Sequence, residues 1–503
     1  NKMKNIFAKA LGVAAVAAMT MTSCGDSFLD TDIYDAVDME GALDNANRVE
    51  LALNGTYYRF SQYYFAGNYA TVTPDIASDI TYWNGSNSHQ NAMYQFNYLD
   101  TEYSMLYIWA YGYKVVDNSA RIIQACDEQI PTASETDKAT LIRAKAEAHA
   151  LRAYAMSVMT NVFGHQVKVN GQDYSSTPGV VVVDTPVEPG TTVSRSTVGD
   201  CYAQILSDLD KALAGFNEVG DRRSLFAFGK ASTLGLMARV KLMLEDFDGA
   251  AQAAADALAA KGISTLTYDP EAYEALYAGN NTNTESFLAL ALDEKTNWSA
   301  NSCGTLFTSY CYGPSPYLVG LMGENDIRTA IWYWTDQKRS QIVPYGDAVP
   351  WFGGGKFGVP ASGNCAEATN YLINAPEMFL IEAEAKLRSA SGKDLDGARR
   401  ALLVVAKRNL DITSTADLPS DEAALMSFIR DERARELFQE GHRLWDLRRW
   451  NVTTGLTAYQ APTVKWRINN VTLGDLVLPI PVDEVNAGFG VAQNEGWEAT
   501  RPQ

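Results

Sequence analysis

Pairs of alanine-rich segments with helical periodicity recur along the chain, and they restrict it to a mainly helical fold. The clearest pair joins residues 103–130 to residues 138–164, with a capping-box-like start at residues 134–137. In the second segment Ala144 and Ala148 recur at helical spacing, and such small side chains let a partner helix approach closely. We therefore expect helix–turn–helix units that pack against one another.

The same two-helix arrangement returns at residues 198–262 and at residues 376–409. Helix pairs with alanines at their crossing points are typical of tetratricopeptide-like scaffolds, although this chain keeps no strict repeat period. Three long segments interrupt the pairs: residues 164–196, residues 262–373 and the chain from residue 451 onward. They are rich in Gly, Asn, Pro, Ser and Thr, so we expect loops with short strands there.

The N-terminal end has the pattern of a secretory signal. A basic start precedes the apolar residues 10–19, which as a helix would reach about 15–18 Å, too short for a hydrocarbon core of about 30 Å. The pattern predicts a signal peptide over residues 1–23. Residues 21–24, Met-Thr-Ser-Cys, resemble a bacterial lipobox, which predicts cleavage before Cys24 and lipidation of its thiol. An ordinary signal peptide followed by a chance cysteine is the alternative.

The charge balance limits the possible partners. The chain of 503 residues has a formal net charge of −19, which argues against nucleic acid and against unaided binding to acidic membrane surfaces. Heavily sulfated or uronate-rich ligands are disfavoured for the same reason. The part after Cys24 is long enough for one large domain or two ordinary ones.

Cysteines and histidines give little sign of a disulfide framework or a metal site. If Cys24 is lipidated, five cysteines remain, and an odd number implies no complete framework. Cys303 and Cys311, eight residues apart in a loop, are the pair that suggests a bridge. Zinc is not expected, because there is no C-x-x-C pair and the four histidines are scattered.

Enzyme motifs are mostly absent from the sequence. The glycines before Lys356 are followed by Phe357, so the phosphate-loop spacing is not met, and neither a G-x-S-x-G nor an H-E-x-x-H motif occurs. A glycosidase-type pair of carboxylates stays open, because its two members need not be neighbours in sequence.

Aromatic residues gather in two regions. Residues 57–113 hold 17 Phe, Trp and Tyr residues, and the polar loop at 78–91 within them carries Tyr82 and Trp83. A second aromatic region runs from Trp298 to Trp351. Flat rings beside Asn and Asp side chains suit a sugar, because a ring stacks on the apolar face of a pyranose while amides and carboxylates bind its hydroxyls. The alternative is that these rings pack the loops onto the helices, which we expect for Tyr107, Trp109 and Tyr111.

An arginine-rich run at residues 428–451 indicates a cluster of ion pairs with a structural role. Acidic and basic side chains alternate at helical spacing, so the run is largely self-neutralising. Gly441 suits a helix C-cap before a second short helix. We expect Arg443, Asp446 and Arg449 to fasten helices and not to bind substrate.

The arginine-rich run and four other segments occur in the order found in the SusD/RagB family of Bacteroidetes nutrient-binding lipoproteins, and the chain therefore resembles that family. Together with the lipobox, the resemblance covers essentially the whole mature chain. The segments that carry it are LRAYAMSVMTNVFG (151–164), FGKASTLGLMARVKLML (228–244), LINAPEMFLIEAEAKL (372–387), ERARELFQEGHRLWDLRRW (432–450) and LPIPVDEVNAGFGVAQNEGW (478–497).

The resemblance implies a mainly α fold with four tetratricopeptide-like helix pairs and a looped subdomain packed beside them. It predicts a single domain over residues 24–503. The helical scaffold would span about residues 100–260 and 374–450. The ligand-binding, loop-rich part would span about residues 262–373 together with the C-terminal tail.

The resemblance also implies a function. Such proteins are surface-exposed, lipid-anchored proteins of the outer membrane that capture oligosaccharide, cap a SusC-like TonB-dependent transporter and deliver the ligand to it. No catalytic activity, cofactor or nucleic acid is implied. The positions that match the ligand-binding loops of the family are Asp79, Tyr82, Trp83, Asn84, Trp298, Tyr310 and Tyr312.

Two alternatives to glycan capture remain at this point. A peptide-binding, RagB-like member of the same family would share the fold and the anchor. A secreted glycoside hydrolase or lyase would need two carboxylates about 5–10 Å apart at a cleft, which an aromatic binding platform does not need.

Overall fold

The computed structural model describes residues 42–83, 87–96, 98–332, 352–358, 360–453 and 471–496. The predicted signal peptide, the lipidation site Cys24, the predicted ligand residue Asn84 and the aromatic Trp351 lie outside these residues. Within them, no helix is long and apolar enough to cross a membrane.

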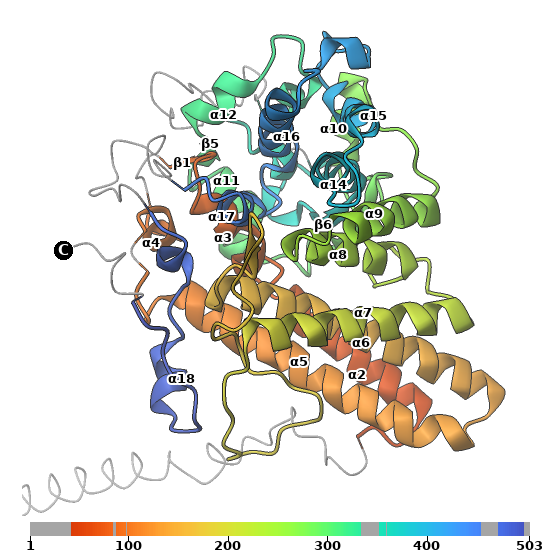
Figure 1. Cartoon of the computed structure of the whole chain (residues 1–503). Coiled ribbons are helices and arrows are strands. Elements are labelled where there is room, and N and C mark those ends of the chain that lie inside the picture. The colour runs from red at the N-terminus through yellow and green to blue at the C-terminus, as the bar shows by residue number, and fades with distance from the viewer. Residues whose placement is uncertain are drawn as a thin grey trace, which may run out of the picture.

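Long helices build most of the molecule, which confirms the predicted mainly helical fold (Figure 1). The first group occupies the lower half of Figure 1 and packs pairwise, α2 on α5, α5 on α6 and α6 on α7. Its members are α2 (Ala46–Ser61), α5 (Tyr103–Gln129), α6 (Glu135–Phe163) and α7 (Val198–Val219).

A second group of helices continues the scaffold. Helix α9 packs both on its neighbour α8 and on α14, more than a hundred residues further along the chain, and α14 in turn packs on α15 and α16. The bounds are α8 (Lys230–Met243), α9 (Phe247–Lys261), α14 (Ala375–Arg388), α15 (Leu395–Ala406) and α16 (Glu422–Leu437).

Capping side chains mark the starts of α6 and α7, and the sequence predicts the one at residues 134–137. The Ser134 side chain accepts a hydrogen bond from the backbone N–H of Asp137 at the start of α6. Thr197 and Asp200 form a complete capping box at the start of α7. Each cap satisfies backbone donors that would otherwise lack an intrahelical partner.

Small residues at the helix crossings explain the close packing. Ala144 and Ala148 are buried in α6. A Cβ atom added to Gly112 of α5 would lie 2.5 Å from the Sδ atom of Met159 in α6, and one added to Gly215 of α7 would also collide with α6. The alanine pattern in the sequence therefore reflects real helix–helix contacts.

Short strands and short helices connect the long helices, and many of them lie in the segment between α9 and α14, as its composition predicts. Three two-stranded antiparallel sheets occur among the described residues, and two of them pair strands more than eighty residues apart. The strands are β1 (Thr81–Trp83) with β5 (Tyr312–Pro314), β2 (Lys168–Val169) with β3 (Gln172–Asp173), and β4 (Ser286–Leu290) with β6 (Asn370–Asn374). The short helices are α3 (Tyr69–Ile76), α4 (Asn91–Tyr94), η2 (Ile130–Thr132), α10 (Pro270–Leu276), η3 (Ser299–Asn301), α11 (Cys303–Phe307), α12 (Pro316–Leu321), η4 (Ile327–Ile331), η5 (Gly355–Phe357), η6 (Cys365–Glu367), η7 (Thr415–Asp417), α17 (Arg443–Arg449), η8 (Gly474–Leu476) and α18 (Val482–Asn486).

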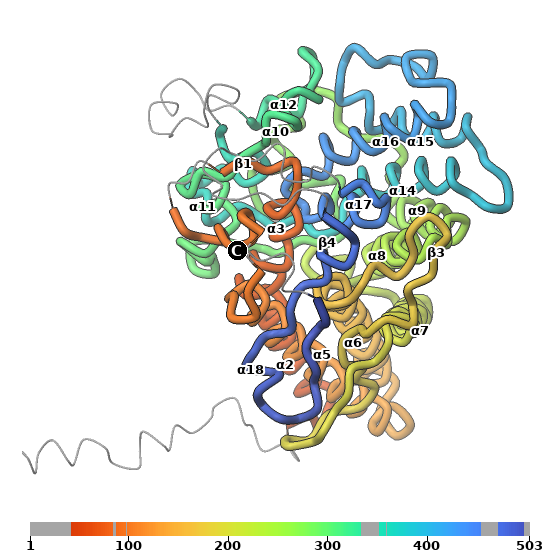
Figure 2. The backbone as a smooth tube through the Cα atoms, turned by 60° about the vertical axis from the view of Figure 1, so that its left-hand side comes forward, coloured from red at the N-terminus to blue at the C-terminus, as the bar shows by residue number. Residues whose placement is uncertain are grey.

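The C-terminal segment lies beside the first group of helices. Figure 2 shows the dark blue tube of this segment next to α5 and to the yellow loop that follows α6. Backbone hydrogen bonds fix it there, from Leu478 to Val162 and from Val193 to Phe489.

The arginine-rich run forms a network of buried ion pairs. Asp446 accepts hydrogen bonds from Arg433 at 2.7 Å and from Arg449 at 2.9 Å, and Arg449 also pairs with Glu384 of α14. Charges from α14, α16 and α17 thus meet in the interior, where each charge needs a partner. This geometry agrees with a structural role for the run.

Two local expectations are wrong. Gly441 does not cap α16, which ends at Leu437; it has φ +78° just before α17, where a Cβ atom would lie 1.8 Å from the carbonyl oxygen of Thr71. Cys303 and Cys311 form no bridge, because both are free, buried thiols. The Cys303 thiol lies against the Gly67 carbonyl, and burial raises its pKa to about 12.

Candidate functional site

Strands β1 and β5 bring together the two aromatic regions that the sequence singles out. Trp83 lies opposite Tyr312 in the register, and Tyr82 lies opposite Gly313. Past the end of the pairing, the Ser315 hydroxyl donates a hydrogen bond of 2.6 Å to the Asp79 carbonyl. Residues more than two hundred positions apart are therefore held in one small sheet.

The rings carried by this sheet are mostly buried. Trp83 is 4% exposed, lies nearly parallel to Tyr312 at 6.0 Å between ring centroids, and meets the ring of Tyr94 edge-on at 5.6 Å. The Tyr312 hydroxyl donates to the His89 carbonyl at 2.7 Å, and burial raises the pKa of Tyr312 and of Tyr82. In this conformation these rings support the loop from within, and their contact with a ligand stays a prediction.

A half-exposed pair of rings is carried by the segments that flank this sheet, Tyr310 before β5 and His89 after β1. The Tyr310 ring stacks on the His89 imidazole with centroids 4.1 Å apart and an interplanar angle of 12°. Asn87 fixes the pair, since its side-chain amide donates to the Tyr310 carbonyl and its side-chain oxygen accepts from the His89 N–H at 2.8 Å. Partial burial lowers the pKa of His89, so the imidazole is neutral at neutral pH. The pair offers an uncharged, flat surface with an amide beside it.

Asp79 is bound within the protein. Its two carboxylate oxygens accept hydrogen bonds from Arg443 of α17 at 2.7 and 3.0 Å. The neighbouring carboxylate of Asp75 accepts from the backbone N–H groups of Gly441 and Arg443, and burial raises the pKa of Asp75 to about 6. These contacts tie the loop before β1 to the arginine-rich network.

Trp298 belongs to a different group of rings. Its indole lies 6.5 Å from the ring of Tyr58 and 6.2 Å from that of Tyr63, both from the end of α2 and the loop after it. The Asn68 amide donates to the Asn301 carbonyl at 2.7 Å and holds η3 against that loop. The indole N–H of Trp298 is buried and has no hydrogen-bond partner among the described residues.

Sequence reasoning missed His89 and Asn87, although both lie in the polar loop at 78–91. They lie four and six residues after Trp83, in a stretch whose sequence shows neither helical nor strand periodicity. Both residues come close to Tyr310 because β1 pairs with β5. Strand pairing over this distance is not readable from one sequence.

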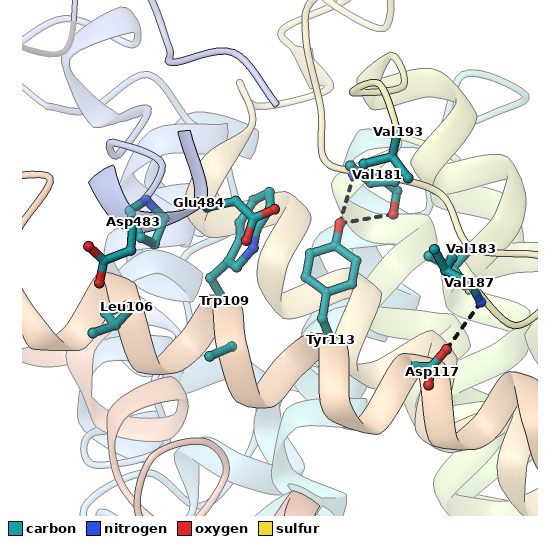
Figure 3. Close-up of a pocket in the computed structure, with 12 residues that line it drawn as sticks. Leu106, Trp109, Tyr113, Asp117, Val181, Val183, Val187, Val193, Asp483 and Glu484 are labelled. Atoms are coloured by element: carbon teal, nitrogen blue, oxygen red, sulfur yellow. Dashed lines mark hydrogen bonds between the residues drawn. The ribbon is translucent and has the colours of Figure 1, made fainter. Parts of the chain in front are cut away.

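A cavity of about 430 Å³ lies elsewhere, between α5, the loop after α6 and α18 (Figure 3). Trp109 and several valines line it, and Asp117 and Glu484 lie at its border. The Tyr113 hydroxyl donates to the Val181 carbonyl at 2.9 Å and accepts from the Val181 N–H at 2.7 Å. None of the predicted site residues lines this cavity.

No group of three or more His, Cys, Asp or Glu side chains in the described part of the chain is arranged to hold a metal ion. Apart from the ion pair of Asp79 with Arg443, the side chains described at the β1–β5 sheet offer neutral rings and amides. Such a surface can bind a polar, uncharged ligand by stacking and hydrogen bonding.

Comparison with known families gives two matches. Residues 27–242 match a family model, SusD-like, described as starch-binding and associating with the outer membrane. Residues 362–497 match a second model, that of the SusD family. A search of curated proteins gives no match.

Solved structures with the same fold come from Bacteroides species. A SusD superfamily protein of Bacteroides thetaiotaomicron is 22% identical with a TM-score of 0.76, and the match covers 90% of this chain and 99% of that one. A SusD superfamily protein of Bacteroides vulgatus is 22% identical with a TM-score of 0.75, covering 91% and 100%. A SusD-like carbohydrate binding protein of the same species is 19% identical with a TM-score of 0.66, covering 80% and 83%.

Proposed function

The chain belongs to the SusD family, and on this premise we propose that it is a glycan-binding protein that captures oligosaccharide without chemistry of its own. The observation that carries the proposal is the stacked pair of Tyr310 and His89 on the β1–β5 sheet. The pair is neutral, half-exposed and fixed by Asn87, and a fixed ring loses little entropy when a sugar stacks on it.

The charges of the site favour binding over hydrolysis. A glycosidase needs two carboxylates free to act as acid and as base or nucleophile. Asp79, the carboxylate that the sequence places in the site, is instead held by two hydrogen bonds from Arg443. We therefore keep glycoside hydrolysis or lysis as the weaker alternative.

Peptide capture is the other alternative, and the surface chemistry disfavours it. Extended peptides are commonly held through backbone hydrogen bonds to an open sheet edge or through charged pockets. The partly exposed groups beside the β1–β5 sheet include the rings of Tyr310 and His89 and the side chain of Asn87, which fit pyranose rings and hydroxyls better.

Anchoring and delivery complete the proposal. The SusD family is associated with the outer membrane. We propose that Cys24 carries the lipid that holds this protein at the cell surface, and that a SusC-like TonB-dependent transporter receives the captured ligand. The lipobox-like residues 21–24 and the family membership support this part.

Affinity electrophoresis against a panel of neutral polysaccharides, beginning with soluble starch, tests the proposal. Tyr310→Ala should weaken binding about 5- to 150-fold, because a stacked aromatic ring contributes on the order of 1–3 kcal/mol. Tyr174→Ala is the matched control. Tyr174 directly follows β3, outside the β1–β5 sheet, and it is also half-exposed and stacks on His165 with ring centroids 4.2 Å apart. Equal retention of both variants and the wild type would count against the site.

A further inference from the structure

A continuous surface of aromatic rings extends along α5, outside the β1–β5 sheet. Tyr103, Tyr107 and Tyr111 follow one another at a spacing of four residues, so they form a stripe on one face of the helix. The Tyr103 and Tyr107 rings are stacked, with centroids 5.7 Å apart and an interplanar angle of 15°. Tyr64 lies between the next two, 4.4 Å from Tyr107 and 4.5 Å from Tyr111.

The loop between α2 and α3 continues this surface as far as Trp298. Tyr63 lies 3.9 Å from Tyr64, 6.4 Å from Tyr69 and 6.2 Å from Trp298. Trp298 then contacts Tyr58 at 6.5 Å. We call these rings the tyrosine platform: Tyr58, Tyr63, Tyr64, Tyr69, Tyr103, Tyr107, Tyr111 and Trp298.

The platform is exposed, unlike the packing rings of the same helix. Tyr103 is 62% exposed and Tyr58 is 59% exposed, and the other members are half-buried. Trp109, on another face of α5, is buried and meets the ring of Phe163 edge-on. Packing therefore accounts for Trp109, whereas the platform rings pack partly on one another and stay partly exposed, and a contiguous exposed aromatic patch often marks a binding surface.

The chemistry of the platform fits an uncharged chain of sugars. Most of its members are phenol rings. Partial burial, with a smaller contribution from the carboxylate of Glu102, raises the pKa of Tyr69 to about 12, so this hydroxyl stays protonated. The charged groups beside the platform are Lys114, which lies 4.2 Å from the Tyr111 ring, Arg59 near Tyr111 and Glu102 near Tyr69. A polyanion would meet few cations here and the net charge of −19 of the whole chain.

The length of the platform sets the size of the ligand. From Tyr103 to Tyr111 the helix rises about 12 Å, so the stripe alone is longer than a single sugar ring. At the other end lies Trp298, whose buried indole N–H has no hydrogen-bond partner among the described residues. Tyr310 belongs to the same insertion, three residues after the end of α11.

We propose that the tyrosine platform is a second carbohydrate-binding surface, which holds several consecutive sugar rings of an extended neutral polysaccharide. This inference rests on the proposed function, because it takes the ligand of the β1–β5 site to be a glycan. It adds that the natural substrate is a long chain: the platform holds its length while Tyr310 and His89 bind a short stretch of it.

Chain-length dependence of binding tests the proposal. The mature protein is titrated with a polysaccharide that it retains in electrophoresis and with the trisaccharide of the same linkage. Tyr103→Ala/Tyr107→Ala should weaken binding of the polysaccharide by about 10-fold or more and leave binding of the trisaccharide unchanged. Tyr310→Ala should weaken both.

Two control variants separate stacking from other effects. Tyr103→Phe/Tyr107→Phe keeps the ring faces and should retain most of the affinity for the polysaccharide. Leu51→Ala removes another exposed side chain, from α2 and outside the platform, and should change nothing. Circular dichroism of each variant checks that α5 is intact.

Different results would overturn the platform and the proposed function. Wild-type affinity of Tyr103→Ala/Tyr107→Ala for the polysaccharide would overturn the platform alone. If the Tyr103→Ala/Tyr107→Ala variant bound sugar normally but no longer co-purified with a transporter, the platform would be a protein interface, and this result would also overturn the platform alone. Absence of carbohydrate binding by the wild-type protein across the panel would overturn both.

Discussion

At the scale of single residues, Trp83 is predicted as a ligand-binding residue, but the structure shows its indole buried among other rings. The sequence predicts its loop as ligand-facing because the loop is too polar to need an indole for packing. The structure supplies packing partners from far along the chain: Tyr312 on the paired strand β5, and Tyr94. No local pattern could reveal these contacts, because they depend on how two distant segments pair.

Trp83→Ala is therefore expected to affect stability and binding together. Removing a large buried ring costs about 3–5 kcal/mol of unfolding free energy, and the loop that carries His89 would lose its support. We expect a lower melting temperature and weaker glycan binding in the same sample, measured by thermal unfolding and calorimetry.

Trp83→Phe is the control, because it keeps an aromatic ring in the same space. It should recover most of the stability and most of the affinity. Full stability of Trp83→Ala with abolished binding would instead show that the indole contacts the ligand directly.

At the scale of elements, the junction of α3 with α17 depends on close backbone approach. The sequence correctly indicates that Gly441 lies near a helix end, but it assigns the wrong reason. The residue has φ +78° and lies against the Thr71 carbonyl, and both features require glycine. A contact partner on another helix is not visible in sequence, whereas the capping box of α7 is, because all its members are local.

Gly441→Ala should destabilise the protein by several kcal/mol, since a methyl group would collide with a backbone oxygen that cannot move without displacing α3. Gly262→Ala is the matched comparison: Gly262 has φ +71° at the end of α9 but open space around it, so only about 1 kcal/mol of conformational strain is expected. Chemical denaturation measures both, and equal losses would contradict the steric explanation.

The same junction should respond to pH through Asp75. Burial raises its pKa in the folded protein to about 6, above the value near 4 of the unfolded chain. Between about pH 4 and pH 6 the folded state then binds more protons at this group than the unfolded state. The contribution of Asp75 to stability is therefore present below about pH 4 and is lost as the pH rises through 6.

Asp75→Asn removes this titration, so the stability of the variant relative to wild type should increase by about 2–3 kcal/mol from pH 4 to pH 7. Denaturation curves at the two pH values measure the difference. Parallel pH profiles of the two proteins would mean that the pKa of Asp75 is not raised.

At the scale of the whole molecule, the fold was largely predictable and the surface was not. Alanine spacing and capping residues are local signals, and they locate α5 to α9, α14 and α15 within a few residues, whereas the end of α16 is misplaced because Gly441 is not its C-cap. The tyrosine platform depends on which face of α5 stays partly uncovered. The sequence predicts Tyr107 and Tyr111 as packing rings, and Tyr111 does pack against the core while staying partly exposed. Only the positions of the loop after α2 and of η3 determine that surface.

The lipid anchor is a whole-molecule prediction of its own. Cys24→Ala should prevent lipoprotein processing and release the mature chain from the membrane, because the acyl chains contribute about 0.8 kcal/mol for each buried methylene. Cell fractionation with metabolic labelling by a fatty acid measures this. A labelled, membrane-bound Cys24→Ala protein would contradict the predicted lipidation site.

Calorimetric titration of the mature protein with a retained polysaccharide, followed by analysis of the sugar for new reducing ends, tests the central claim most directly. The account predicts saturable binding, weakened in Tyr310→Ala but not in Tyr174→Ala, and a polysaccharide whose chain length is unchanged. New reducing ends would indicate a hydrolase, and the absence of saturable heat with every neutral polysaccharide would contradict glycan capture.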